Sequence, residues 1–314
     1  MPAPIPLVLD TDPGQDDALA LLLALALPDR LDVRAICTVA GNVPLPLTTA
    51  NALRLVELAG RPDVPVHPGC DRPLLEPLRT AEFVCGPDGL AGAGLPPPRL
   101  AASATHAVPA LLALLEASPP RGLTLCMLGP LTNLAVALAQ RPDLALRIAR
   151  IVVMGGARDL GNITADAEFN FHVDPHAARI VLASGVPITL FGLHATHQAM
   201  ATPERTAAIA ALGTNTARAV AGMLSRHRPG GRERFGADGH PMHDPCTVAW
   251  LLWPELFSGK DCVVDVETAS PLTLGRSSID WWGRSGRPPN AFVVDRLDAE
   301  ALFARMTEAL ARLP

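Results

Sequence analysis

The chain has 314 residues, of which 49% are hydrophobic and 18% are charged, and its formal net charge is −5. A chain of this length and composition can bury a large core, so we expect one globular domain over residues 1–314. The slightly acidic balance does not favour nucleic acid or an anionic membrane, and we expect neither as a partner.

The six cysteines are scattered and form no C-x-x-C pair. This usage is typical of a reduced, cytoplasmic protein. The segment MPAPIPLVLD contains no basic region followed by a long apolar stretch, so no signal peptide is expected. The longest apolar helix, about residues 18–27, is too short to span a bilayer.

Short apolar runs alternate with helical patterns along the first two thirds of the chain. Strands are expected at residues 5–10, 31–41, 123–128, 149–156 and 186–192. Helices are expected at residues 16–27, 47–60, 129–140 and 174–185. This rhythm predicts an α/β fold with a mostly parallel central sheet flanked by helices.

The last third of the sequence is less regular. Residues 263–268 and 290–297 are expected to form strands, and residues 298–313 a closing helix. Stretches rich in proline and glycine at 96–98 and 226–239 are expected to be surface loops.

Acidic and amide side chains follow the predicted strands. In open parallel sheets, ligands bind beyond the carboxyl ends of the strands, so these side chains are expected to meet at one end of the sheet. They are Asp10, Asp12, Asp16, Asp17, Asn42, Asn133, Asn162, Asp166, Glu168 and Asn170, joined late in the chain by His243 and Asp244.

Four aspartates fall within eight residues at the start of the chain: Asp10, Asp12, Asp16 and Asp17. An aspartate that opens a helix is usually an N-cap or a partner of the helix dipole, which would explain one of them. Several carboxylates at close range repel one another unless a cation lies among them. Oxygen ligands favour a hard cation such as calcium or magnesium.

Two pairs of histidines have spacings that can hold zinc on a helix: His172 with His176, and His194 with His197. His172 lies before the expected helix start at Asp174, and the pair His194 and His197 follows a strand, so we expect structural roles for these histidines. The chain contains neither a P-loop motif nor the G-x-S-x-G motif of an acyl-transfer serine.

Several motifs resemble those of the inosine-uridine type nucleoside hydrolases, and the likeness spans nearly the whole chain. DTDPGQDDALA (residues 10–20) is the first motif. It is followed in order by VAGN (39–42), LGPLTNLA (128–135), VVMGG (152–156), GNITADAEFNFHVDPHAA (161–178), LHATHQ (193–198) and HDP (243–245).

The resemblance implies the nucleoside hydrolase fold, a single α/β domain. It also implies hydrolysis of the N-glycosidic bond of ribonucleosides to ribose and free base, with a tightly bound Ca²⁺. Homodimers or homotetramers are expected. The transition state of such a cleavage resembles an oxocarbenium ion.

The resemblance also implies roles for individual residues. Calcium ligands would be the side chains of Asp12, Asp17 and Asp244 and the main-chain carbonyl of Leu128, with Asp10 supporting them from behind. Asp12 would act as the general base on a calcium-bound water. The ribose would be bound by Asp16, Asn42, Asn162, Glu168, Asn170 and Asp244, with Met154 nearby.

His243 is the expected acid that assists departure of the base, because the ordinary pKa of histidine suits proton transfer near neutral pH. The sequence departs from the family at two points. Cys85 stands where members often carry a histidine, and the chain has no tyrosine to place over the base. His227, Arg228 or Phe235 could cover the base instead, so the purine or pyrimidine preference stays open.

Two other readings compete with this one. A phosphatase of the haloacid dehalogenase type also begins with an Asp-x-Asp motif after a strand, but it needs a later lysine, and the only lysine here is Lys260. A non-catalytic, metal-dependent nucleoside or sugar sensor would keep Asp12, Asp17 and Asp244 without a proton donor.

Overall fold

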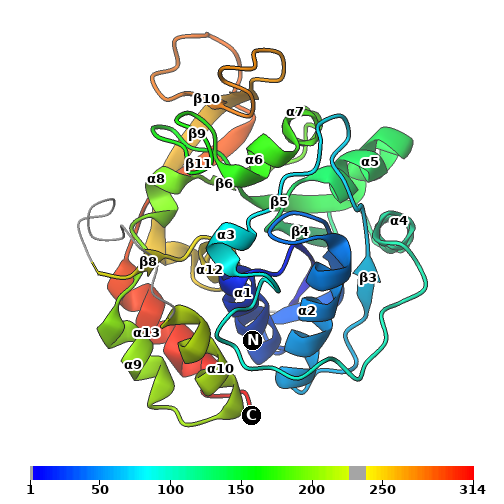
Figure 1. Ribbon diagram of the computed structural model, residues 1–314. Coiled ribbons are helices and arrows are strands. Elements are labelled where there is room, and N and C mark those ends of the chain that lie inside the picture. The colour runs from blue at the N-terminus through cyan, green and yellow to red at the C-terminus, as the bar shows by residue number, and fades with distance from the viewer. Residues whose placement is uncertain (1–2, 226–237) are drawn as a thin grey trace.

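A nine-stranded sheet forms the centre of the computed structural model, which describes residues 3–225 and 238–314 (Figure 1). Across the sheet the strands are β10 (Ser277–Asp280), β9 (Phe257–Val266), β11 (Ala291–Leu297), β6 (Ile188–Phe191), β5 (Ile148–Met154), β4 (Leu123–Met127), β1 (Ile5–Thr11), β2 (Leu31–Thr38) and β3 (Val66–Pro68). The seven strands from β11 to β3 pair in parallel, whereas β9 pairs antiparallel with both β11 and β10. The expected mostly parallel sheet flanked by helices is thus confirmed.

Side chains of successive strand residues enter two different cores, one on each face of the sheet. Leu7 and Leu9 of β1 belong to one core, and Val8 between them belongs to the other. The first core is covered by α1 (Gln15–Ala26), α2 (Leu45–Leu58), α9 (Pro203–Ala210), α10 (Asn215–Leu224), α12 (Asp244–Leu252) and α13 (Ala299–Leu310). The second is covered by α4 (Ala107–Ala117), α5 (Thr132–Gln140) and α7 (Pro175–Leu182).

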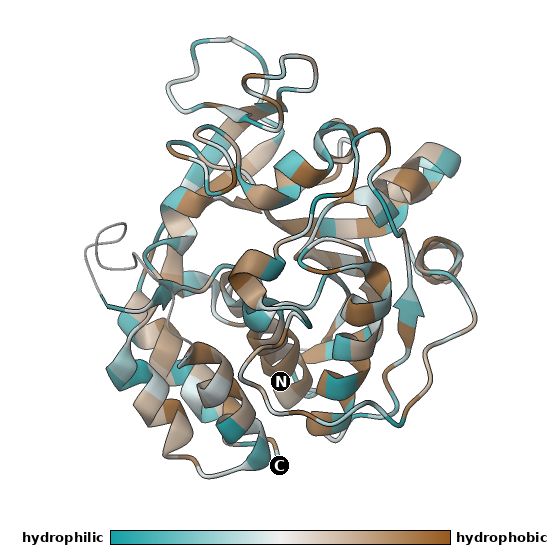
Figure 2. Cartoon of the chain, in the orientation of Figure 1, coloured by the Kyte–Doolittle hydropathy of each residue, from teal (hydrophilic) through white to brown (hydrophobic). Residues whose placement is uncertain are grey.

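From Ala18 onward α1 consists only of alanine and leucine, which Figure 2 draws in brown tones. The helix packs against α12, α13, α2 and α10. All its residues except Asp16 are buried. Its long apolar stretch therefore belongs to a core helix. Among residues 3–225 and 238–314, no helix combines the length and apolarity needed to cross a membrane.

The remaining elements are short. They are α3 (Glu82–Cys85), α6 (Phe169–Val173), α8 (Leu193–Thr196), two 3₁₀ helices (Pro142–Arg147 and Pro254–Leu256), and the strand pair β7 (Met200–Ala201) and β8 (His240–Pro241).

The strand order reverses direction at β1. After β1 the chain forms β2 and β3 on one side of β1, and it later forms β4, β5 and β6 on the other side. Loops that leave β1 and β4 therefore run in opposite directions, and in open parallel sheets ligands bind at such a place beyond the strand ends. The segments that follow these two strands carry Asp12 and Leu128.

Several boundaries differ from those expected. Strand β9 begins at Phe257, six positions before residue 263, and α5 begins at Thr132, after Pro130. Helix α2 begins at Leu45 and ends at Leu58, so Gly60 lies beyond its end as expected. Residues 96–98 are irregular, as expected of a loop. His227, Arg228 and Phe235 lie outside the described residues.

Candidate functional site

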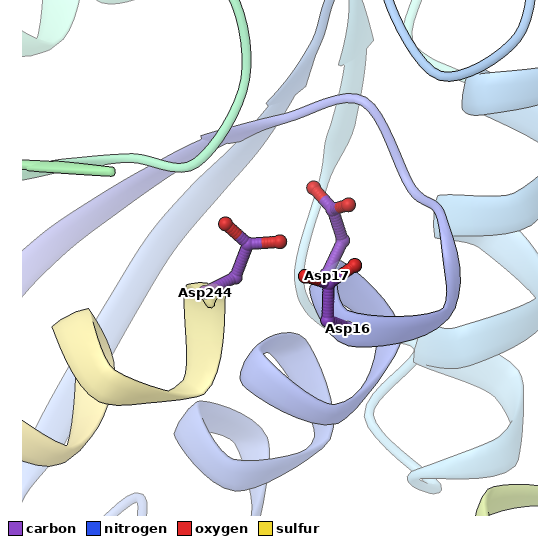
Figure 3. Close-up of side chains that lie close together, drawn as sticks. All are labelled: Asp16, Asp17 and Asp244. Atoms are coloured by element: carbon purple, nitrogen blue, oxygen red, sulfur yellow. The ribbon is translucent and has the colours of Figure 1, made fainter. Parts of the chain in front are cut away.

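Three carboxylates meet where two helices begin. Oxygen atoms of Asp16, Asp17 and Asp244 all lie within 4.8 Å of one another (Figure 3). Asp16 and Asp17 come from the first turn of α1, and Asp244 is the first residue of α12. Because α1 packs against α12, residues more than two hundred positions apart reach one place. Side chains with oxygen donors in such a cluster could hold a hard metal ion.

Asp12 is buried beside this cluster with a narrow space around its carboxylate. Its Oδ2 accepts a hydrogen bond of 2.7 Å from the main-chain N–H of Asn42. Its Oδ1 is buried and has no hydrogen-bond partner among the described residues. A methyl group at Gly41 would lie 2.1 Å from Oδ2, and one at Gly129 would lie 2.4 Å from Oδ1. The two glycines therefore make room for the carboxylate.

Asp17 also accepts hydrogen bonds from residues outside the cluster. Its Oδ1 accepts a hydrogen bond of 2.6 Å from Thr11 Oγ1. Its Oδ2 accepts hydrogen bonds from the main-chain N–H of Gly14, at 3.1 Å, and from Asn42 Nδ2, at 3.0 Å. The bond from Gly14 helps to cap α1, so capping and cluster membership coexist in Asp17.

Burial raises the pKa values of Asp12, Asp17 and Asp244. The pKa values of Asp12 and Asp244 lie well above the usual range because of burial first and then the charges of neighbouring aspartates. The pKa of Asp17 is raised by burial and by the charge of Asp16. A cation among them would remove this repulsion and favour the ionised forms.

Asp10 and Leu128 lie behind the cluster and link β1 to β4. The pKa of Asp10 is raised by burial to about 7, and its Oδ2 accepts a hydrogen bond of 2.9 Å from Asn133 Nδ2. The main-chain N–H of Leu128 donates to the carbonyl of Asp10 at 2.7 Å. The carbonyl of Leu128 accepts from Asn170 Nδ2 at 2.6 Å, so one of its two lone pairs is used within the protein.

Glu168 organises the loop that follows β5. It caps α6, because its Oε1 accepts from the N–H of Asn170 at 2.9 Å and its Oε2 accepts from the N–H of Phe171 at 3.1 Å. The Oε2 also accepts from the N–H of Gly156 at 2.9 Å. Asn162 Oδ1 accepts from the N–H of Phe169 at 2.9 Å, which closes the loop.

Asn170 and Met154 join this loop to the sheet. Asn170 Nδ2 donates to the carbonyl of Met154, the last residue of β5, at 3.1 Å. The same amide nitrogen reaches Leu128 after β4. The predicted ribose residues of this loop are therefore joined to the carboxyl ends of two neighbouring strands.

His243 lies immediately before Asp244, at the N-cap of α12. Its Nδ1 lies 2.7 Å from Thr196 Oγ1, and its main-chain N–H donates to Asp16 Oδ2 at 3.4 Å. The ring of His197 is tilted by 58° against the ring of His243, with centroids 5.7 Å apart. Thr196 was not predicted from the sequence and His197 was expected to be structural, although the motif LHATHQ contains both.

Cys85 is buried in α3, and its thiol lies 3.2 Å from the carbonyl of Ala81, to which it donates. Burial and the charges of Asp12, Asp16 and Asp17 raise the pKa of the thiol to about 12. The residue that replaces the family histidine is therefore a neutral thiol close to the acidic cluster.

The zinc interpretation of the histidine pairs receives no support from the described residues. His172 and His176 lie on separate helices, α6 and α7, and His176 Nε2 lies 3.8 Å from a carboxylate oxygen of Glu76. His194 Nδ1 accepts from the main-chain N–H of Arg158 at 3.2 Å.

The sequence of the chain shows its family. Residues 7–304 match the family model described as inosine-uridine preferring nucleoside hydrolase, and the chain belongs to this family. A pyrimidine-specific ribonucleoside hydrolase, RihA, of Shewanella sp. strain ANA-3 is 44% identical over 307 residues, which cover 98% of this chain and 96% of that protein.

Solved structures agree with this assignment. The fold is similar to that of a plant nucleoside hydrolase, PpNRh1, with a TM-score of 0.90 and 32% identity over 98% of this chain and 99% of that chain. A purine-preferring ribonucleoside hydrolase from Gardnerella vaginalis gives a TM-score of 0.89 and 28% identity over 97% of this chain and 98% of that chain.

The protein is therefore a hydrolase that acts on the N-glycosyl bonds of ribonucleosides, not a sensor or a phosphatase. The phosphatase alternative also fails on geometry. Lys260 lies on β9, which four strands separate from β1, and its Nζ donates to the carbonyl of Trp281. It cannot serve a phosphate bound next to Asp10.

Proposed function

We propose that this protein hydrolyses pyrimidine ribonucleosides in a calcium-dependent reaction at the carboxylate cluster beyond the end of β1. The observation that carries the proposal is the convergence of Asp12, Asp16, Asp17 and Asp244 where the strand order reverses. Four buried or half-buried carboxylates, of which Asp12, Asp17 and Asp244 have raised pKa values, are costly to keep together unless a cation and a polar substrate use them.

The donor set suits calcium. In this proposal the ion is held by Asp12, Asp17, Asp244 and the main-chain carbonyl of Leu128. The buried Oδ1 of Asp12 makes no hydrogen bond to the described residues, and all the donors are oxygen atoms, as calcium prefers. The bound cation would lower the pKa of a water molecule in the site and stabilise negative charge there.

Asp12 then acts as the general base that accepts a proton from the attacking water. The N–H of Asn42 donates to one oxygen of its carboxylate, and the other oxygen makes no hydrogen bond to the described residues. Asp10 holds the end of β1 from behind through Asn133, and its carbonyl holds the N–H of Leu128. These contacts fix the position of the base relative to the sugar.

The ribose is bound by Asp16, Asn42, Asn162, Glu168, Asn170 and Asp244, with Met154 beneath it. Carboxylates and amide oxygens around the sugar favour the positive charge that develops on the ring as the C–N bond breaks. Hydrogen bonds to the hydroxyls hold the sugar in the reactive orientation.

His243 donates a proton to the departing base. The Nδ1 atom of His243 lies 2.7 Å from Thr196 Oγ1, a contact that orients the ring, and the proposal assigns the proton transfer to Nε2. Protonation of the leaving group matters most for natural bases, which are poor leaving groups.

The pyrimidine preference rests on the 44% identity with a relative named as pyrimidine-specific. The test is a comparison of kcat/KM for uridine, cytidine, inosine and adenosine on the purified protein. Uridine or cytidine should exceed both purine nucleosides at least tenfold. A purine nucleoside with the highest kcat/KM would reject the preference and leave the reaction class intact.

Two further expectations belong to the proposal: a cytoplasmic location and assembly as a homodimer or homotetramer. Cell fractionation tests the location, and light scattering on the purified protein tests the assembly. A monomer at micromolar concentration would reject the second.

A further inference from the structure

The hairpin of β9 and β10 contacts the loop that follows β5. This loop, residues 155–168, carries Asn162 and Glu168, two residues to which the proposed function assigns ribose contacts. In Figure 1 the hairpin lies at the top of the view, beside α6. The hairpin itself contributes no residue to the proposed site, so its contacts with the loop need another explanation.

Ser277, the first residue of β10, makes the closest contact. It is 4% exposed, and its hydroxyl accepts from the N–H of Ala157 at 2.7 Å and donates to the carbonyl of Ala157 at 2.8 Å. One side chain therefore binds both main-chain polar groups of one residue. The preceding residue, Gly156, donates its N–H to Glu168 Oε2 at 2.9 Å. Ser277 is thus linked to the Glu168 carboxylate through two adjacent residues.

Residues just before Ser277 hold the other side of the loop. Arg276 Nη1 lies 2.8 Å from Asp166 Oδ1, and the carbonyl of Leu274 lies 3.0 Å from His172 Nδ1 in α6. Gly275 has a φ of +80°, and a Cβ there would lie 2.6 Å from the Cα of His172. The turn of the hairpin is therefore closely packed against α6 and the end of the loop.

We propose that Ser277 and Arg276 are positioning residues for ribose binding. They hold loop 155–168 so that Glu168 and Asn162 meet the sugar, and they do not touch the substrate themselves. This inference rests on the proposed function, because it takes the ribose as the ligand of the loop. Its physical basis is that a shift of about 1 Å in a binding group can cost on the order of 100-fold in rate.

The main test compares Ser277→Ala with Ser278→Ala. Ser278 is the next residue of the same strand and is exposed, so it is a matched control. The readouts are the inhibition constant of D-ribose and the KM and kcat for uridine. Ser277→Ala should raise the inhibition constant of ribose and the KM about tenfold, and Ser278→Ala should change neither more than twofold. A role limited to stability would lower the melting temperature without changing the inhibition constant.

A second pair of variants keeps the test decisive if Ser277→Ala does not fold. Arg276→Gln removes the contact with Asp166, whereas Arg287→Gln removes a similar exposed ion pair with Asp265 that does not reach the loop. Arg276→Gln should raise the inhibition constant of ribose about threefold, since exposed ion pairs contribute little. Arg287→Gln should leave it unchanged.

The outcomes separate this inference from the proposed function. Hydrolysis of uridine by the wild-type protein and the effect of Glu168→Gln on ribose inhibition test the proposed function alone. Unchanged ribose inhibition in both Ser277→Ala and Arg276→Gln, in a protein that hydrolyses uridine, would overturn the positioning role. If the inhibition constant of ribose increased in Ser277→Ala and Arg276→Gln but not in Glu168→Gln, the role of Glu168 would be rejected. Positioning through Asn162 would then be supported.

Discussion

The hydroxyl of Thr196 and the Nδ1 of His243 lie 2.7 Å apart, although 47 positions separate the two residues in the chain. Thr196 is the last residue of α8, which follows β6, and His243 precedes α12. The contact therefore joins the end of a sheet strand to the helix that begins with Asp244. It orients the imidazole to which the proposed mechanism gives the role of acid.

Thr196→Val should reduce kcat for uridine about tenfold, because the buried side chain keeps its shape but loses the contact that fixes His243. The loss should be small for an activated aryl riboside, whose leaving group needs no proton. Thr196→Ser keeps the hydroxyl and should restore most of the activity. Equal losses on both substrates would show that Thr196 supports the fold, not proton donation.

The ligand set of the cation can be separated from the sugar contacts by two substitutions. Asp16 belongs to the observed carboxylate cluster, but the proposed function assigns it to ribose and assigns Asp12 to calcium. Asp12→Asn should weaken calcium binding roughly 100-fold or more and abolish turnover, whereas Asp16→Asn should retain calcium binding and lose ribose inhibition. Calorimetric titration with calcium measures the first effect. If Asp16→Asn lost calcium and Asp12→Asn retained it, the two roles would have to be exchanged.

Cys85 should be dispensable for proton transfer. Burial holds the pKa of its thiol at about 12, so the thiol stays neutral and bound to the carbonyl of Ala81. Cys85→Ala should therefore keep kcat for uridine within about threefold of the wild type. Iodoacetamide should react slowly with the native protein at this position, as mass spectrometry of the digested protein would show. A loss of kcat of a hundredfold would instead make Cys85 a catalytic group.

Glu168 should make stability depend on pH. Burial raises its pKa from 4.5 to about 7, so between these values the folded protein binds more protons than the unfolded chain. The free energy of unfolding should consequently fall as the pH rises through this window, by about 3 kcal/mol from this group.

Urea unfolding at pH 5 and pH 8, with chelator present throughout, measures this contribution. Glu168→Gln should remove the part of the decrease in unfolding free energy that Glu168 contributes between these pH values. Glu204→Gln is the control, because Glu204 is exposed and a hydrogen bond from Thr202 lowers its pKa, so its contribution is complete before pH 5. The same pH dependence in Glu168→Gln and the wild type would contradict the assignment.

The sequence was sufficient to predict the sheet because its parallel strands are buried on both faces and read as apolar runs, as in β4 and β5. Helices α4, α9 and α10 were not predicted, because their periodic pattern was not recognised. Strand β10 was not predicted either. That strand has only four residues, and its place is set by pairing with β9. Helix α12 was located only by its first residues, through the HDP motif.

The residues of the candidate site that lie in local motifs could be predicted from the sequence. The resemblance marked Asp12, Asp17 and Asp244, and the packing of α1 against α12 brings Asp17 and Asp244 together. The contacts of Thr196 with His243 and of Ser277 with Ala157 depend on tertiary packing, and a hydroxyl side chain carries no sequence signal of its distant partner. Such contacts require the folded coordinates.

Release of ribose from uridine tests whether this hydrolase needs calcium at the carboxylate cluster. The protein would be assayed as purified, after removal of metal by a strong chelator, and after addition of calcium. Turnover should disappear when the metal is stripped and return when calcium is added. Full turnover in the stripped protein, with metal loss verified by elemental analysis, would contradict it.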